Sequence, residues 1–197
     1  MKRLILLSLI LVSTIGSNAF AKEYVNGKLG VYFPDESAFD DGFNIEAAYG
    51  RDFTDFFPET VRQNPWLKNV TLEAGIGYYT ADFSETISGF GLVPDTKVKG
   101  DLSVVPLTLT GIYNYPLSGT NFNFFGGGGV GLYFSDAEVR MDGSKEDDSS
   151  VDLGLRFAGG GEYLLSPQFS LGAELRFDVV SDDIGGVFVN FLGKYRF

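Results

Sequence analysis

The chain contains no histidine. Histidine is the usual general base near neutral pH and the commonest transition-metal ligand in proteins. Its absence excludes a serine–histidine hydrolase and leaves most zinc sites without a donor that they need. We therefore predict no catalytic residue, no metal site and no cofactor. Catalysis by carboxylates alone is the enzymatic route that stays open.

Cysteine is also absent, so the fold cannot depend on disulfide bonds. Positive charge is scarce, because 15 basic residues stand against 26 acidic ones and the formal net charge is −11. Nucleic-acid binding needs a basic footprint. The charge balance therefore argues against a nucleic-acid partner.

Long apolar runs are missing except at the N-terminus. There, residues 4–15 form an almost continuous apolar run behind Lys2 and Arg3, and Ala19 and Ala21 supply the small residues that signal peptidase reads. This pattern predicts a cleaved secretory signal peptide, because the run is too short for a membrane-spanning helix of about 20 residues. The cleavage site lacks cysteine, which excludes a lipoprotein anchor.

We thus expect residues 1–21 to be removed and residues 22–197 to form one domain. Without Lys2 and Arg3 the formal net charge of the mature chain is −13. No later apolar run approaches 18 residues, the length that marks a transmembrane helix. If the mature chain enters a membrane, it must do so as a closed barrel, since only helices and closed barrels satisfy every backbone polar group in lipid.

A period of two dominates the mature sequence. In residues 187–197 the apolar side chains fall on every second position, while Lys194 and Arg196 lie on the other face. Alternate residues of a strand point to opposite sides of a sheet, so this segment is a strand. The same test predicts seven more strands, near residues 28–34, 42–50, 69–79, 103–115, 122–134, 151–163 and 169–177.

The connections alternate in length. Tight turns are expected at 116–121 and 166–168, and long polar connections at 83–97 and 136–150. The strand segments 97–115 and 122–140 can run to about 18 residues, whereas roughly 9–11 suffice to cross a bilayer, so we expect the excess to stand outside the membrane as hairpin extensions. Short periplasmic turns alternating with longer outer loops are typical of bacterial outer-membrane barrels.

Residues 51–68 depart from this pattern, because the connection should be periplasmic and yet is long. Phe53, Phe56 and Phe57 have the i, i+3, i+4 spacing that suits a short helix. Such a helix would lie on the inner, periplasmic surface of the membrane that the barrel spans. A disordered loop is the alternative.

Alternation by itself also fits a soluble lipocalin-like barrel with its apolar face inward. Charged residues in the middle of the strands, on the face opposite the apolar one, favour the inverted arrangement. Aromatic residues at the strand ends match the belts expected at lipid–water interfaces: Tyr49, Tyr113, Tyr115, Phe122, Phe124, Tyr163, Phe169, Tyr195 and Phe197. We predict an all-β fold, an eight-stranded antiparallel up-and-down transmembrane β-barrel.

The closing stretch, with Phe191, Tyr195 and Phe197, resembles the C-terminal insertion signal of outer-membrane barrels. Three stretches resemble the first strands of the small "porin family" barrel domain, which includes the outer-membrane protein A barrel and the opacity-type surface proteins: residues 30–34, 42–46 and 72–78. The resemblance implies a monomer in a Gram-negative outer membrane, in contact with lipid and lipopolysaccharide. It also implies insertion by the barrel-assembly machinery through the C-terminal strand.

Eight charged residues are expected to face the lumen: Glu46, Glu73, Arg156, Glu162, Glu174, Arg176, Lys194 and Arg196. An eight-stranded barrel is only wide enough for its side chains to fill it, and isolated burial of one ion costs several kcal/mol. One interpretation is a salt-bridge core that holds the barrel shut. The other is a gated, narrow path for water or ions.

Two further patterns have structural interpretations. Gly126–Gly131 matches the glycine spacing of a dinucleotide site, but no helix follows, so we interpret these glycines as aids to tight curvature with aromatic rings packed over them.

The outer connections are acidic, which suits solvation and repulsion between cells; divalent-cation bridging to lipopolysaccharide is the alternative. The acidic residues are Asp35, Glu36, Asp40 and Asp41, then Asp136, Glu138, Asp142, Glu146, Asp147 and Asp148.

The leading functional prediction is a non-enzymatic barrel with a structural role or a surface role, in which its loops meet an unidentified ligand. The alternative is a narrow, gated, porin-like channel for small solutes or ions. A lipid-modifying enzyme is disfavoured, since the known barrel enzymes of that class resemble one another in needing histidine.

Overall fold

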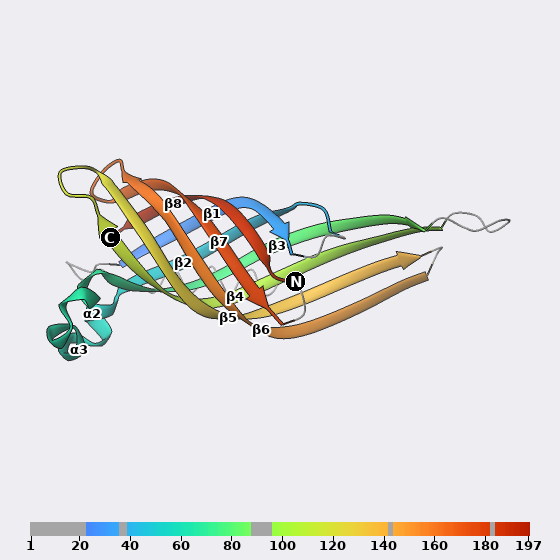
Figure 1. Cartoon of the computed structure of the whole chain (residues 1–197), viewed down its shortest axis with the longest axis horizontal. Coiled ribbons are helices and arrows are strands. Elements are labelled where there is room, and N and C mark those ends of the chain that lie inside the picture. Colours follow the sequence, from blue (N-terminus) through green and yellow to red (C-terminus); the bar gives the residue numbers. More distant parts are fainter. Residues whose placement is uncertain (1–22, 36–38, 88–95, 142–143, 182–183) are drawn as a thin grey trace.

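The computed structural model describes residues 23–35, 39–87, 96–141, 144–181 and 184–197. Within them eight antiparallel strands form a closed barrel in sequence order (Figure 1). This confirms the predicted fold class. The strands are β1 (Glu23–Pro34), β2 (Gly42–Asp52), β3 (Val70–Ile87), β4 (Thr96–Pro116), β5 (Phe122–Met141), β6 (Ser144–Leu164), β7 (Phe169–Val180) and β8 (Gly186–Arg196).

The barrel closes between β1 and β8. Their register runs from Tyr24 opposite Arg196 to Pro34 opposite Gly186. β1 is longer than the predicted 28–34 because its first residues also pair with β8. Closure matters in a membrane because an open edge would leave backbone groups without partners in lipid.

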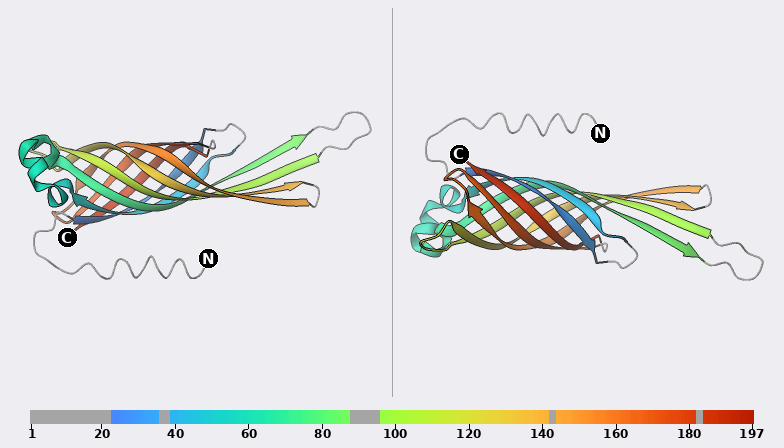
Figure 2. Two further views of the ribbon diagram at one scale, coloured as in Figure 1. Left: turned by 90° about the horizontal axis from the view of Figure 1, so that it is seen from below. Right: turned by 90° about the horizontal axis from the view of Figure 1, so that it is seen from above.

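The strands have two distinct lengths. β1, β2, β7 and β8 have 11 or 12 residues, whereas β3 to β6 have 18 to 21. About 9–11 residues suffice to cross a bilayer. The four longer strands therefore continue past the barrel, away from the end that holds the C-terminus (Figures 1 and 2).

The predicted extension of the strands at 97–115 and 122–140 is confirmed, and the polar loops predicted at 83–97 and 136–150 are shorter than expected, with residues 88–95 outside the described residues. β3 continues to Ile87 and β4 begins at Thr96, while β5 and β6 are separated only by residues 142–143. Beyond the bilayer neither face of a strand has to meet lipid, so the apolar alternation that marks a crossing strand is not required there. Cross-strand pairing continues without that signal. We call the described parts of residues 80–104 and 134–152 the extension.

The apolar face of the barrel points outward, as predicted. Leu153 and Phe191 are each 71 % exposed, and Tyr115 and Phe124 at the strand ends are also exposed. The opposite face is buried and polar, with charged side chains such as Glu162 fully enclosed. The lipocalin-like alternative, with the apolar face inward, is therefore wrong.

The connection between β2 and β3 is helical rather than a structureless loop. It contains α2 (Phe53–Phe56), α3 (Pro58–Gln63) and the 3₁₀ helix η2 (Pro65–Asn69). Proline begins both α3 and η2. At the first position of a helix the backbone N–H makes no intrahelical hydrogen bond, so the missing N–H of proline costs nothing there.

In the described ranges no helix is long and apolar enough to span a membrane. The expected signal peptide at 1–21 lies outside the described residues.

The connection between β4 and β5 is a tight turn, as predicted. The Leu117 N–H donates to the Phe122 carbonyl at 2.9 Å, and the Thr120 N–H donates to the Leu117 carbonyl at 3.1 Å. Gly119 has φ +79°, a conformation that glycine adopts without a Cβ clash.

Glycines on the inner face let neighbouring strands and rings approach closely. A Cβ on Gly50 would lie 2.1 Å from the Tyr24 ring, and one on Gly160 would lie 2.6 Å from the Phe125 ring. A Cβ on Gly127 would lie 2.1 Å from the Gly111 carbonyl oxygen on β4. The glycine run therefore serves curvature and packing.

Gly127→Ala should destabilise the barrel by about 1–3 kcal/mol, because the added methyl overpacks against backbone that cannot move aside. Gly126→Ala is the matched control, since its Cβ would meet nothing nearer than the Ala158 carbonyl oxygen at 3.7 Å. Urea unfolding of the protein in lipid vesicles measures both. Equal unfolding midpoints for the two variants would contradict the close-approach argument.

Candidate functional site

Glu46 lies at the centre of the lumen and receives three cations. One of its oxygens is 2.7 Å from Nη1 of Arg156 and 2.8 Å from Nη1 of Arg176. Its other oxygen is 3.1 Å from Nζ of Lys28. All four side chains are at most 3 % exposed, and one carboxylate cannot balance three cations, so further buried carboxylates rather than solvent must compensate the remaining positive charge.

Asp178 completes this arginine cluster. Arg156 donates from Nε and Nη2 to the two Asp178 oxygens, both at 3.0 Å, in the bidentate geometry that suits a guanidinium–carboxylate pair. Arg176 lies with its Nε 3.4 Å from Asp178, and its guanidinium is 3.7 Å from the centre of the Phe188 ring. The ionic layer thus continues directly into an aromatic one.

Lys28 connects the cluster to two further carboxylates. Its ammonium lies 3.1 Å from Glu73 and 2.9 Å from Glu174. Asn190 donates to the remaining Glu174 oxygen at 3.0 Å, and the Tyr24 hydroxyl donates to Glu73 at 3.1 Å. A single lysine therefore holds carboxylates from three strands together.

A second cluster surrounds Glu162 nearer the end with the tight turns. Lys194 lies 3.2 Å from one Glu162 oxygen, and Arg196 lies 2.6 Å from the other. Asn123 and Ser170 donate to the same carboxylate at 2.9 Å and 2.8 Å. Glu162 is fully buried and its hydrogen-bonding capacity is largely used, so it acts as a structural anchor of this cluster.

The structure brings the eight predicted lumen residues into these two clusters. Sequence reasoning missed Lys28 and Asp178 as members. Asp178 falls on the inward face of β7, and Lys28 begins the predicted first strand, so the alternation could have placed both. With them, the two clusters hold five carboxylates and five cations among the described residues.

An aromatic layer closes the lumen on the other side of the ionic layer. Tyr32 stacks on Phe188 with ring centres 4.6 Å apart, and Tyr79 packs against both. The Tyr32 hydroxyl donates to the Gly185 carbonyl at 2.9 Å, and the Tyr79 hydroxyl donates to the Ile184 carbonyl at 2.9 Å. All three rings are completely buried. The rings thus form a packed layer in the lumen next to the ionic one.

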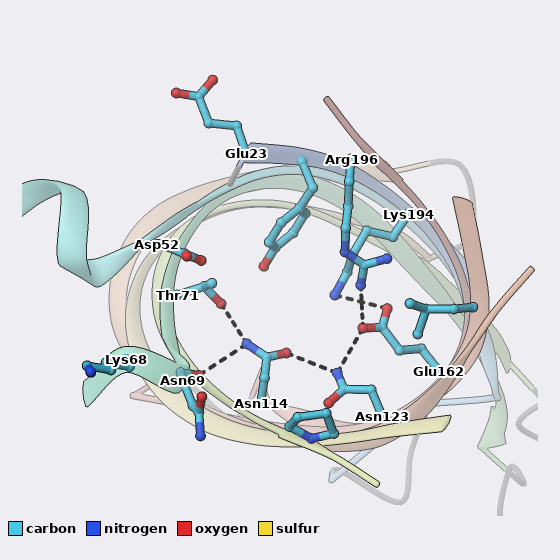
Figure 3. Close-up of a pocket in the computed structure, with 13 residues that line it drawn as sticks. Glu23, Asp52, Lys68, Asn69, Thr71, Asn114, Asn123, Glu162, Lys194 and Arg196 are labelled. Atoms are coloured by element: carbon cyan, nitrogen blue, oxygen red, sulfur yellow. Dashed lines mark hydrogen bonds and ion pairs between the residues drawn. The ribbon is translucent and has the colours of Figure 1, made fainter. Parts of the chain in front are cut away.

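A cavity of about 410 Å³ opens at the end with the tight turns. Figure 3 shows Asn114, Asn123, Glu162 and Arg196 joined by hydrogen bonds and an ion pair around its inner part. Glu162, Lys194 and Arg196 of the second cluster line this cavity, which we call the vestibule. Across the described ranges, no group of three or more carboxylates is arranged to hold a metal ion.

The protein-family comparison matches residues 4–197 to the outer membrane protein beta-barrel domain. The chain belongs to this family. Membership places the barrel in the outer membrane. In barrels of this kind the short turns face the periplasm and the longer connections face outward, so we expect the tight turns, the start of β1 and the end of β8 on the periplasmic side and the extension outside. No curated protein matches the chain.

Solved structures share the barrel fold at low sequence identity. Neisserial surface protein A is 15 % identical, with a TM-score of 0.60 over 89 % of this chain and 97 % of that one. A major outer membrane protein from Thermus thermophilus is 18 % identical, with a TM-score of 0.54 over 90 % and 99 %. The attachment invasion locus protein Ail of Yersinia pestis, in complex with the heparin analogue sucrose octasulfate, is 15 % identical, with a TM-score of 0.51 over 90 % and 97 %.

Glu46→Gln should destabilise the folded barrel by about 3–5 kcal/mol, because it keeps the shape but leaves three buried cations short of a negative partner. Glu59→Gln is the control: Glu59 pairs with Arg62 at 3.1 Å, but both side chains are over 70 % exposed, so less than about 1 kcal/mol is expected. Urea unfolding in lipid vesicles gives both values. Similar losses for the two variants would show that the lumen network contributes no more than a surface ion pair.

Proposed function

We propose that this outer-membrane barrel is a non-enzymatic, non-conducting protein that acts through its extension. The observation that carries the proposal is the contrast between lumen and exterior. The lumen is filled by compensated charges and by the buried layer of Tyr32, Tyr79 and Phe188, whereas β3 to β6 continue well beyond the bilayer. Four paired strands give the exterior a defined surface, which a structureless loop would not.

The charge of the extension limits its partners. Residues 80–104 and 134–152 contain eleven acidic and four basic residues. Ail is described with a heparin analogue, which is a polyanion. Electrostatic repulsion disfavours such a ligand for this chain, so we propose a neutral or cationic surface partner.

A conductance measurement distinguishes the proposed non-conducting barrel from the channel alternative. In planar bilayers the purified, refolded protein should show no reproducible open state, while a reference porin inserted under the same conditions should conduct. The physical reason is that a path would have to break the bonds of Glu46 to Arg156 and Arg176 and also displace the rings beyond them. Regular unitary steps in the wild type would support the channel instead.

Export and insertion complete the proposal. We propose that residues 1–21 are cleaved on export. The mature monomer then contacts lipid and lipopolysaccharide through its outer wall. The barrel-assembly machinery recognises β8. Phe191, Tyr195 and Phe197 support the last point, because all three are exposed on the outer face.

Phe197→Ala should slow folding into vesicles that contain the assembly machinery by several-fold, and should change unassisted folding little. Phe43→Ala is the matched control, because Phe43 is an equally large exposed ring on the wall, outside the last strand. The ratio of assisted to unassisted folding rates, followed by heat-modifiable gel migration, is the measurement. A ratio unchanged from wild type in Phe197→Ala would remove the recognition role.

A further inference from the structure

Three large rings stand exposed on the helical connection between β2 and β3, which we call the elbow (residues 53–69). Phe56 is 49 % exposed, Phe57 is 48 % exposed and Trp66 is 60 % exposed. They come from α2, from the residue that joins α2 to α3, and from η2. Val61 is the buried residue of the same elbow, so the segment has an interior and nevertheless leaves these rings outside it.

Three of the four charged residues of the elbow, by contrast, have ion-pair partners; the fourth, Lys68, borders the cavity. Arg51, at its base, lies 3.1 Å from Asp55, and Arg62 lies 3.1 Å from Glu59. Phe53 and Phe57 pack with ring centres 4.8 Å apart. The exposed surface therefore combines locally paired charges with exposed aromatic rings, a combination that suits the boundary between lipid headgroups and acyl chains.

The position of the elbow indicates which surface contacts these rings. It leaves β2 after Asp52 and returns at Val70, at the end of the barrel with the tight turns, and it projects sideways from the rim (Figures 1 and 3). Asn114 donates to the Asn69 carbonyl at 3.3 Å, which ties the last turn of the elbow to β4. The neighbouring wall residue Tyr113 belongs to the exposed aromatic band. The elbow thus adjoins the lipid-facing wall at its periplasmic edge.

We propose that the elbow docks on the inner leaflet of the outer membrane, with Phe56, Phe57 and Trp66 in the headgroup–acyl boundary. The lipid surface is the occupant because the elbow is joined at both ends to strands that already stand in that bilayer, so the rings reach the leaflet without a separate binding event. This side anchor fixes the depth and tilt of the barrel, independently of whether the lumen conducts.

Trp66 is the single tryptophan of the chain, which makes it a native reporter. The refolded protein is placed in phosphatidylcholine vesicles in which part of the lipid carries bromine either near the headgroup end of the acyl chain or near the middle of the bilayer. Trp66 should lose about half its emission with the shallow bromine and less with the deep one, as a ring buried some 5–10 Å would. It should also be shielded from aqueous acrylamide.

Two variants complete the test. Trp66→Phe combined with Phe191→Trp moves the reporter to the lipid-facing wall and calibrates quenching by lipid, since Phe191 is 71 % exposed there. Phe56→Ser combined with Phe57→Ser should raise acrylamide quenching of Trp66 while the barrel still shows heat-modifiable migration. Full acrylamide access without bromine quenching in the wild type overturns the proposal. Shielding that depends on the protein-to-lipid ratio would also overturn it, in favour of a second copy as the occupant.

Discussion

The structure depends on one constraint, that each backbone N–H and C=O within lipid needs a partner inside the protein. β1 meets it by pairing with β2 on one side and with β8 on the other, so no strand in the barrel has a free edge. Closure around eight strands then limits the interior to the width of its own side chains. The outer apolar wall and the filled lumen both follow from this closure.

A narrow lumen cannot hold isolated charges at its inward positions, so the charged side chains there are paired with opposite charges. Glu46 joins Lys28, Arg156 and Arg176, while Glu162 joins Lys194 and Arg196. Buried ion networks add less net stability than their contacts suggest, because the desolvation of each ion offsets much of the attraction. Their consequence is mutual dependence: removing one member leaves others buried without compensation, so the network favours one closed arrangement.

The two ends of the barrel differ because different surroundings act on them. On the outer side the longer strands β3 to β6 keep their pairing in water, and their acidic composition suits a solvated surface. At the other end the connections are tight turns and the helical elbow, which carries three exposed aromatic rings. The features that go beyond a minimal eight-stranded barrel, the extension and the elbow, therefore lie at its two ends.

The sequence by itself determined the barrel, because alternation in a strand decides locally which side chains face lipid and which face the lumen. It also placed Glu46, Arg156 and Arg176 inward. It could not determine that Lys28 meets Glu46, Glu73 and Glu174, since those residues come together only when the register of several strands is set around a closed ring. The length of the segments 97–115 and 122–140 did predict that β4 and β5 extend past the bilayer. The outer parts of β3 and β6 were missed, because outside lipid no apolar face marks a strand and only pairing with neighbouring strands makes those polar residues part of the sheet.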